Sequence, residues 1–112
     1  MSYSINTTPG FEKSVKALAK RYSSIKTDLL KLMETLSENP FQGVELSPGI
    51  RKIRMSIASK GRGKSGGARI ITYTISVDKE NGRVYMIDIY DKADHSSVDV
   101  KIIGRIISEL EI

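Results

Sequence analysis

Near the N-terminus, apolar residues recur every three to four positions in two consecutive segments, which predicts two helices. In the first segment, Phe11, Val15, Leu18 and Tyr22 share one helical face. Thr8-Pro9 stands just before them and supplies an N-cap residue followed by a proline at the first helical position. The second segment places five apolar residues on one face and ends at Asn39-Pro40: Ile25, Leu29, Leu32, Met33 and Leu36. Only Ser23-Ser24 separates the segments, so we expect an antiparallel helix pair.

Beyond Pro40 the apolar positions alternate, which is the pattern of β-strands. A short edge segment is expected at 44–46, between Gly43 and Pro48. In residues 50–57, the apolar side chains of Ile53, Met55 and Ile57 fall on one side, and Lys52, Arg54 and Ser56 fall on the other. Residues 68–77 and 83–90 read as two further strands, joined by a hairpin at 78–82 that ends in Asn-Gly. Arg69 shares odd numbering with Ile71 and Tyr73, so we expect it either to start its strand at a glycine bulge or to lie just outside the sheet.

A last helix is predicted from the apolar stripe of residues 98–110, with Ser96-Ser97-Val98-Asp99 as a capping box. The expected fold is therefore α+β. Two N-terminal helices pack on a small antiparallel sheet of three to four strands, and a C-terminal helix closes the chain. The length of 112 residues fits one domain, 1–112.

Composition removes several classes of function. The chain has no cysteine and one histidine, which excludes disulfides, thiolate chemistry and multi-histidine zinc sites. It also lacks an apolar run of about 20 residues, the length that a membrane-spanning helix needs. We therefore expect a cytoplasmic protein with no cofactor, no metal site and no membrane partner.

The net charge of +5 is unevenly distributed along the chain. Residues 46–77 contain no Asp or Glu and carry seven basic residues: Arg51, Lys52, Arg54, Lys60, Arg62, Lys64 and Arg69. This window contributes +7 and the remainder −2. Such a local excess is typical of a surface that binds a phosphate backbone or an acidic protein.

Three motifs suggest chemistry but have simpler explanations. Gly63-Lys64-Ser65 resembles the end of a nucleotide-binding phosphate loop, yet Ala58 stands where its first glycine is needed and a strand follows where a helix is required. His95 is a candidate general acid or base, although its position before a helix is typical of a surface residue. Asp88, Asp91 and Asp94 are spaced three apart but lack further oxygen ligands, so no metal site is proposed.

Three segments together resemble a known family: Gly49-Ile50-Arg51-Lys52-Ile53-Arg54, Lys64-Ser65-Gly66-Gly67-Ala68-Arg69 and Ile89-Tyr90-Asp91-Lys92-Ala93-Asp94. Their ordered combination is similar to the RelE/HigB superfamily of toxins from bacterial type II toxin-antitoxin modules. The resemblance runs from about residue 9 to residue 110 and includes Phe11-Glu12-Lys13 and Asn39-Pro40-Phe41-Gln42-Gly43.

The resemblance implies metal-independent cleavage of mRNA on the ribosome, by attack of a ribose 2′-OH on the adjacent phosphate, and inhibition by a cognate antitoxin. It assigns catalytic positions to Lys52, Arg54, Arg69 and Lys92. Lys52 would transfer a proton or bind phosphate. Arg54 and Arg69 would stabilise the transition state, because arginine is always protonated. The side chains of Lys52, Arg54 and Arg69 are expected to face the site and not the core.

Four further basic residues are expected to contact RNA: Arg51, Lys60, Arg62 and Lys64. The RelE branch uses a tyrosine near the C-terminus, and no tyrosine follows Tyr90 here. Either Tyr90 or His95 takes that acid-base role, or the basic residues and ribosomal RNA act alone. Two other functions are consistent with the same residues: a ParE-like toxin that targets DNA gyrase, and a noncatalytic RNA-binding module.

Overall fold

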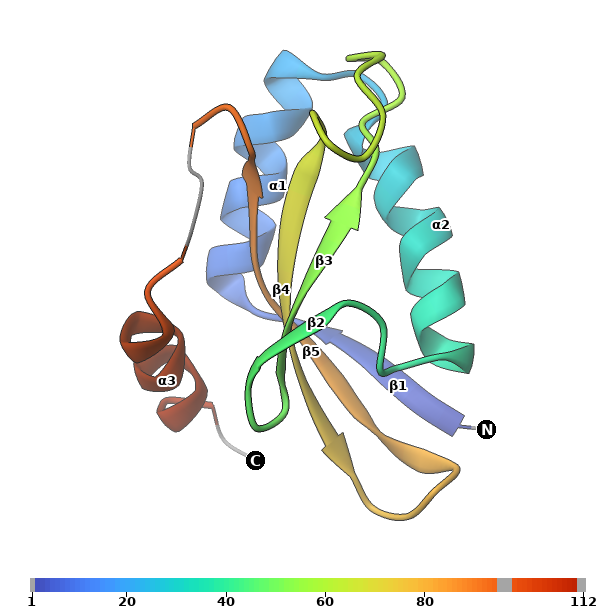
Figure 1. Cartoon of the computed structure of the whole chain (residues 1–112), viewed down its shortest axis with the longest axis vertical. Coiled ribbons are helices and arrows are strands. Elements are labelled where there is room, and N and C mark those ends of the chain that lie inside the picture. Colours follow the sequence, from blue (N-terminus) through green and yellow to red (C-terminus); the bar gives the residue numbers. More distant parts are fainter. Residues whose placement is uncertain (1, 95–97, 111–112) are drawn as a thin grey trace.

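The computed structural model describes residues 2–94 and 98–110 (Figure 1). Three helices and a five-stranded sheet occupy these ranges. In chain order the elements are β1 (Ser2–Thr7), α1 (Pro9–Arg21), α2 (Ile25–Glu38), β2 (Val44–Ser47), β3 (Ile50–Met55), β4 (Ala68–Ser76), β5 (Asn81–Asp91) and α3 (Val100–Ser108). The predicted α+β class, the N-terminal helix pair, the antiparallel strands and the C-terminal helix are confirmed.

The strand order β1-β5-β4-β3-β2 includes a strand that the sequence patterns did not predict. β1 pairs in parallel with β5, so the sheet is mixed and has five strands, where we expected an antiparallel sheet of three or four. Thr8 links this strand to α1: its hydroxyl accepts from the Phe11 amide at 3.2 Å and donates to the Met86 carbonyl at 3.1 Å. The predicted N-cap of α1 is therefore also an anchor to the sheet.

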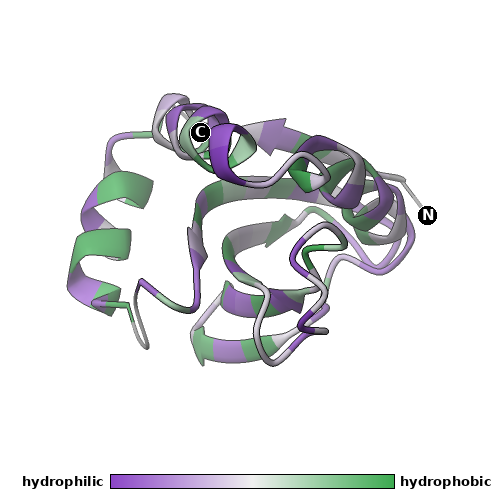
Figure 2. Cartoon of the chain, turned by 90° about the horizontal axis from the view of Figure 1, so that it is seen from above, coloured by the Kyte–Doolittle hydropathy of each residue, from purple (hydrophilic) through white to green (hydrophobic). Residues whose placement is uncertain are grey.

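The two faces of the sheet bury separate apolar clusters. One face packs against α1 and α2 and includes Ile53 and Met55, as the alternating pattern predicted. The strand expected at 50–57 ends at Met55, and Ile57 joins the same cluster from just beyond it. The opposite face packs against α3 through Ile71 and Ile103. Figure 2 shows α3 set apart from the other two helices, with apolar positions along its length. Within the described ranges, no helix is long and apolar enough to cross a membrane.

The third helix begins later than the capping box predicted. Asp99 is its N-cap, and the Asp99 carboxylate accepts from the Lys101 amide at 2.9 Å. Aspartate is itself a strong N-cap residue, so the helix starts at Val100 without the serine we expected in that role. Ser96 and Ser97, like His95, lie outside the described residues.

Candidate functional site

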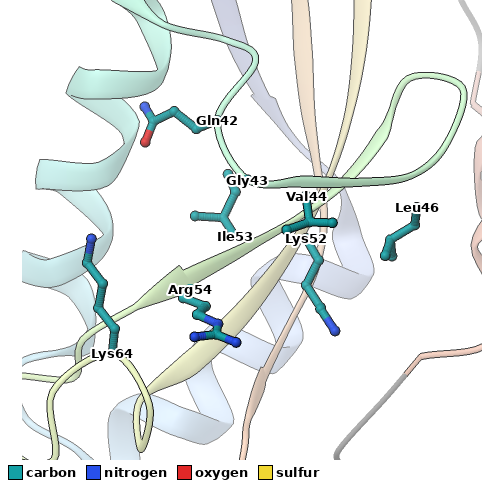
Figure 3. Close-up of a pocket in the computed structure, with 8 residues that line it drawn as sticks. All are labelled: Gln42, Gly43, Val44, Leu46, Lys52, Ile53, Arg54 and Lys64. Carbon is teal, nitrogen blue, oxygen red and sulfur yellow. The ribbon is translucent and has the colours of Figure 1, made fainter.

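A groove lies beside the outer edge of β3, where the sheet is incomplete. β2 pairs with β3 only as far as Lys52, so β2 does not pair with β3 from Ile53 onward. A cavity of about 420 Å³ occupies this place (Figure 3), lined by Gln42, Gly43, Val44, Leu46, Lys52, Ile53, Arg54 and Lys64. A second cavity of about 360 Å³ extends toward α2 and shares three of these residues, Gln42, Arg54 and Lys64. Because the two cavities share these walls, we treat them as one feature, the β3 groove.

Three cationic side chains reach the β3 groove from two parts of the chain. Lys52 and Arg54 project from alternate positions of β3, and Lys64 comes from the loop of residues 56–67. Opposite them, Gly43 passes close to β3 with a φ of +93°, and a Cβ there would lie 2.4 Å from the Lys52 carbonyl oxygen. Only glycine fits this close approach and this left-handed conformation.

Arg69 lies inside the sheet, where it is paired on both sides. Its neighbours across the strands are Arg54 on β3 and Tyr90 on β5, with no register shift at this point. The two alternatives from the sequence, a bulge or a position just outside the sheet, are therefore both wrong. Its guanidinium donates to the carbonyl oxygens of Lys64 (2.9 Å), Ala68 (3.1 Å) and Ser65 (3.3 Å).

Arg69 is also only 4% exposed. We expected this side chain to face the site and not the core; it does lie on the same side of the sheet as Arg54, but it is covered and not at the surface. The reason is local: the loop of residues 56–67 folds over the guanidinium and offers it backbone carbonyls, which are the acceptors that a buried cation requires. Arg69 thus fixes the end of the loop that carries Lys64.

Tyr90 belongs to the apolar cluster under α3 and is 7% exposed. Burial raises the pKa of its hydroxyl; the nearby Arg69 charge opposes this shift and the Asp88 charge adds to it. A phenol with a raised pKa is protonated near neutral pH, which suits a general acid better than a base. His95, the other acid-base candidate, lies outside the described residues.

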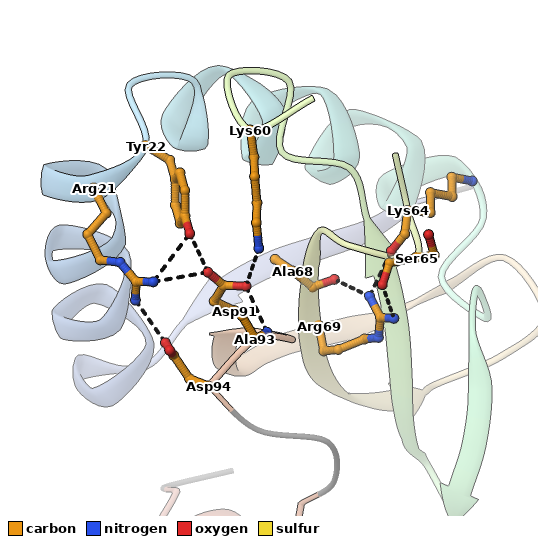
Figure 4. A network of polar contacts seen from close by, with 10 residues as sticks. All are labelled: Arg21, Tyr22, Lys60, Lys64, Ser65, Ala68, Arg69, Asp91, Ala93 and Asp94. Atoms are coloured by element: carbon orange, nitrogen blue, oxygen red, sulfur yellow. Dashed lines mark hydrogen bonds and ion pairs between the residues drawn. The ribbon is translucent and has the colours of Figure 1, made fainter. Parts of the chain in front are cut away.

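Asp91 is the centre of a buried ionic cluster that sequence reasoning missed (Figure 4). Its carboxylate accepts from Lys60 Nζ at 2.7 Å, Tyr22 Oη at 2.5 Å, the Ala93 amide at 3.0 Å and an Arg21 nitrogen at 3.2 Å. Burial alone would raise the pKa of Asp91, but the hydrogen bonds from Lys60, Tyr22 and Ala93 outweigh it and lower the pKa to about 2. The cluster joins the end of α1, the 56–67 loop and the end of β5.

The remaining predicted residues fall into two other places. Arg51 is on the opposite side of β3 from Lys52, where it pairs with Glu45 at 3.4 Å and lies over the Phe41 ring at 5.1 Å. Lys60, Arg62 and Lys92 line a separate hollow of about 410 Å³. The structure therefore brings Lys52, Arg54 and Lys64 together in the β3 groove and places Arg69 next to Arg54 on the adjacent strand. The other predicted basic residues lie outside the groove.

Gln42 also lines the β3 groove, which the sequence patterns did not predict. It belongs to the 39–43 segment that contributed to the family resemblance, but a single glutamine carries no signal by which sequence patterns could assign it a role. Its place in the groove depends on the turn at Gly43, which brings the segment against β3.

No family model matches this chain. Among solved structures, it is similar to the Escherichia coli toxin RelE, determined as a double arginine-to-alanine mutant in the free state. The TM-score is 0.57 at 16% sequence identity, and the alignment covers 98% of this chain and 99% of the other. The fold is therefore RelE-like, as the sequence resemblance implied. At this identity, the likeness establishes the fold alone.

Proposed function

We propose that this protein is a RelE-like toxin that cleaves mRNA bound to the ribosome. The observation that carries the proposal is the β3 groove itself. Its larger cavity is lined by three cations, Lys52, Arg54 and Lys64, and the residues that line this cavity include no acid. A phosphodiester backbone is the natural ligand of such a surface.

In the proposed reaction, the ribose 2′-OH attacks the adjacent phosphorus while the bond to the 5′-oxygen of the next nucleotide breaks. A cyclic phosphate and a free 5′-hydroxyl result. Lys52 binds the phosphate or accepts the 2′-OH proton, and Arg54 stabilises the negative charge that builds up on the phosphorane. The leaving 5′-oxygen needs a proton, for which Tyr90 and His95 are the candidates.

For Arg69 the proposal now has two parts. The family resemblance gives it a role in stabilising the transition state, which requires some of its N–H donors to turn toward substrate. The second part is a positioning role, which is supported by the hydrogen bonds from the guanidinium to the carbonyls of Lys64 and Ser65 in the loop beside the groove.

The test is cleavage of a short mRNA on purified ribosomes. We expect cuts within translated sequence, persistence of cutting in EDTA, and loss of cutting when the ribose 5′ of the cut is replaced by deoxyribose. Arg54→Gln should reduce the rate, while Lys79→Gln, an exposed lysine in the β4–β5 hairpin, should not. Efficient cleavage of the deoxy substrate would exclude the 2′-OH as nucleophile.

A second candidate function is noncatalytic RNA binding, favoured by the enclosure of Arg69 and Tyr90. In that case the β3 groove binds RNA with the same dependence on Arg54, but no product appears. A ParE-like toxin would instead inhibit gyrase supercoiling and leave mRNA uncut. The three functions therefore give three different results with the same purified protein.

The proposal includes a cognate antitoxin that blocks access to the groove. It would mask the charges of Lys52 and Arg54 or displace the C-terminal helix from the sheet. Acidic side chains on such a partner would speed association, so the on-rate should fall as salt rises. Because apolar contacts are not screened, the complex should survive high salt. Co-purification from the native operon is the direct test.

A further inference from the structure

The side-chain amide of Gln42 is held in one orientation at the wall shared by the two cavities. Its nitrogen donates to the Thr35 hydroxyl at 2.9 Å and to the Asn39 carbonyl at 3.2 Å. A carbonyl can only accept, so the group facing Asn39 must be the NH₂. The Thr35 hydroxyl donates its own proton to the Leu32 carbonyl at 2.7 Å, and it therefore also accepts from Gln42.

This arrangement leaves the amide oxygen of Gln42 as a fixed acceptor. No donor among residues 2–94 and 98–110 bonds to that oxygen. Figure 3 shows the side chain extending from the Gly43 turn toward α2, with Arg54 and Lys64 on the neighbouring walls. Both cavities of the β3 groove include Gln42, so a ligand in either can meet this acceptor.

The other polar groups of the groove do not offer the same combination. Lys52, Arg54 and Lys64 can only donate, and contacts of this kind to phosphate carry no sequence information. Asp28 lines only the second of the two cavities, and one of its carboxylate oxygens already accepts hydrogen bonds from the Ser24 hydroxyl and the Ala58 amide. The Ser56 hydroxyl can donate as well as accept, and the Thr35 hydroxyl already accepts from Gln42. Among the described side chains that line the groove, Gln42 is therefore the preoriented neutral acceptor beside the phosphate-binding cations.

We infer that Gln42 selects the base next to the cleaved phosphate by accepting a hydrogen bond from an exocyclic amino group. Adenine, cytosine and guanine carry such a group and uracil does not. The inference rests on the proposed function, because it assumes that Lys52, Arg54 and Lys64 hold the RNA backbone. Selection by a fixed amide is effective because the amide has lost its freedom to rotate, so a base without the donor leaves the oxygen unsatisfied.

The experiment compares two mRNAs that differ by one amino group. Adenosine is placed at one of the two nucleotides flanking the cut and is replaced there by purine riboside, which lacks the 6-amino group. Single-turnover cleavage on ribosomes is measured for the natural chain, Gln42→Leu and Lys79→Gln. For each protein, the result is the ratio of its cleavage rates on the two substrates. If less of Gln42→Leu is folded, both rates fall by the same factor and the ratio is unchanged.

At one of the two flanking positions, we expect the natural chain and Lys79→Gln to cut the adenosine substrate about 5 to 10 times faster, the value of one neutral hydrogen bond of about 1 kcal/mol. The ratio for Gln42→Leu should fall to about 1. Equal ratios in the natural chain and Gln42→Leu, or a ratio near 1 at both positions in the natural chain, would overturn the inference while leaving RNA cleavage intact.

If the natural chain cuts neither substrate, the proposed cleavage fails, and binding then tests the base contact separately. The dissociation constants of single-stranded oligonucleotides with and without the 6-amino group should differ by about the same factor for the natural chain. They should not differ for Gln42→Leu. Equal constants in the natural chain would rule out base selection by Gln42.

Discussion

Arg54 on β3 lies directly opposite Arg69 on β4, so two like charges form one cross-strand pair. Residues paired in this way point to the same side of the sheet and repel each other when they carry the same charge. The two arginines differ in surroundings: Arg54 is exposed to the groove, and Arg69 is enclosed by three backbone carbonyls. No acid bonds to either side chain within the described ranges. A pair that is unfavourable for stability is typical of a functional site.

Replacing Arg54 should therefore separate stability from activity. Arg54→Gln removes the repulsion and keeps the polarity of an exposed position, so we expect unfolding to require about 0.2 to 1 kcal/mol more free energy. The same change removes a phosphate contact and should lower RNA cleavage or binding. Urea denaturation and a cleavage assay on one preparation measure both. A destabilised Arg54→Gln would show that the guanidinium contributes to the fold.

Arg69→Ala should behave in the opposite way. It leaves the carbonyls of Lys64, Ala68 and Ser65 without their donor, and we expect a loss of about 1 to 3 kcal/mol in unfolding free energy. Activity should fall as well, because the loop that carries Lys64 loses its anchor. Arg69→Lys, which keeps a donor, should recover part of the stability. If Arg69→Ala unfolds within 0.5 kcal/mol of the natural chain, the side chain contributes to function only.

Arg54 is exposed and Arg69 is buried, and only the position of Arg54 could be predicted from the sequence. Alternation in residues 50–57 correctly placed Arg54 opposite Ile53 and Met55, because one buried face fixes the register of a strand. Burial of Arg69 depends on the 56–67 loop, whose path is set by tertiary contacts such as Lys60 with Asp91. Such contacts join residues about 30 positions apart and leave no periodic signal in the sequence.

The sequence patterns predicted neither the strand β1 nor the place of Gln42 in the groove, for related reasons. β1 is a short edge strand whose partner, β5, lies about 80 residues away, and only Tyr3 and Ile5 give it an apolar face. Gln42 is a common surface residue until the turn at Gly43 places it against β3. Local patterns therefore predicted the elements, the apolar faces and the cationic strand, while the enclosed parts of the site depended on contacts between distant segments.

Lys64 should contribute to RNA affinity through charge alone. It is exposed, lines both cavities of the β3 groove and belongs to no ion pair among the described residues. Lys64→Ala should weaken binding of all single-stranded RNA sequences to a similar degree. It should also reduce the slope of log affinity against log salt by about 0.7, the value for one single-strand phosphate contact. Fluorescence anisotropy at several salt concentrations measures the slope. Lys79→Ala is the matched control. An equal loss of RNA affinity in both variants would show that binding depends on the net charge of the protein and not on a site at Lys64.

Among the ion pairs of the described residues, those of Asp91 should lose the most stability when a partner is replaced. Asp91 is fully buried, and Asp91→Asn would leave Lys60 facing a neutral group; we expect a loss of about 3 to 5 kcal/mol in unfolding free energy. Lys60→Met should cost less than Asp91→Asn, because Arg21 and Tyr22 still donate to the carboxylate. Chemical denaturation of both variants and their double mutant measures the coupling. Additive losses would show that Lys60 and Asp91 do not stabilise each other.

The same carboxylate should make stability depend on acid in a defined range. The pKa of Asp91 is lowered to about 2 in the folded chain, against about 3.9 for an unfolded aspartate, so the unfolded chain binds its proton first. The stabilisation from Asp91 is thus fully present above about pH 4 and is lost as the pH falls through about 2. The shift corresponds to roughly 3 kcal/mol. Urea unfolding of the natural chain and Asp91→Asn between pH 6 and pH 2 should give two curves that converge as the pH falls. Curves that stay parallel throughout this range would show that the Asp91 pKa is not lowered in the folded state.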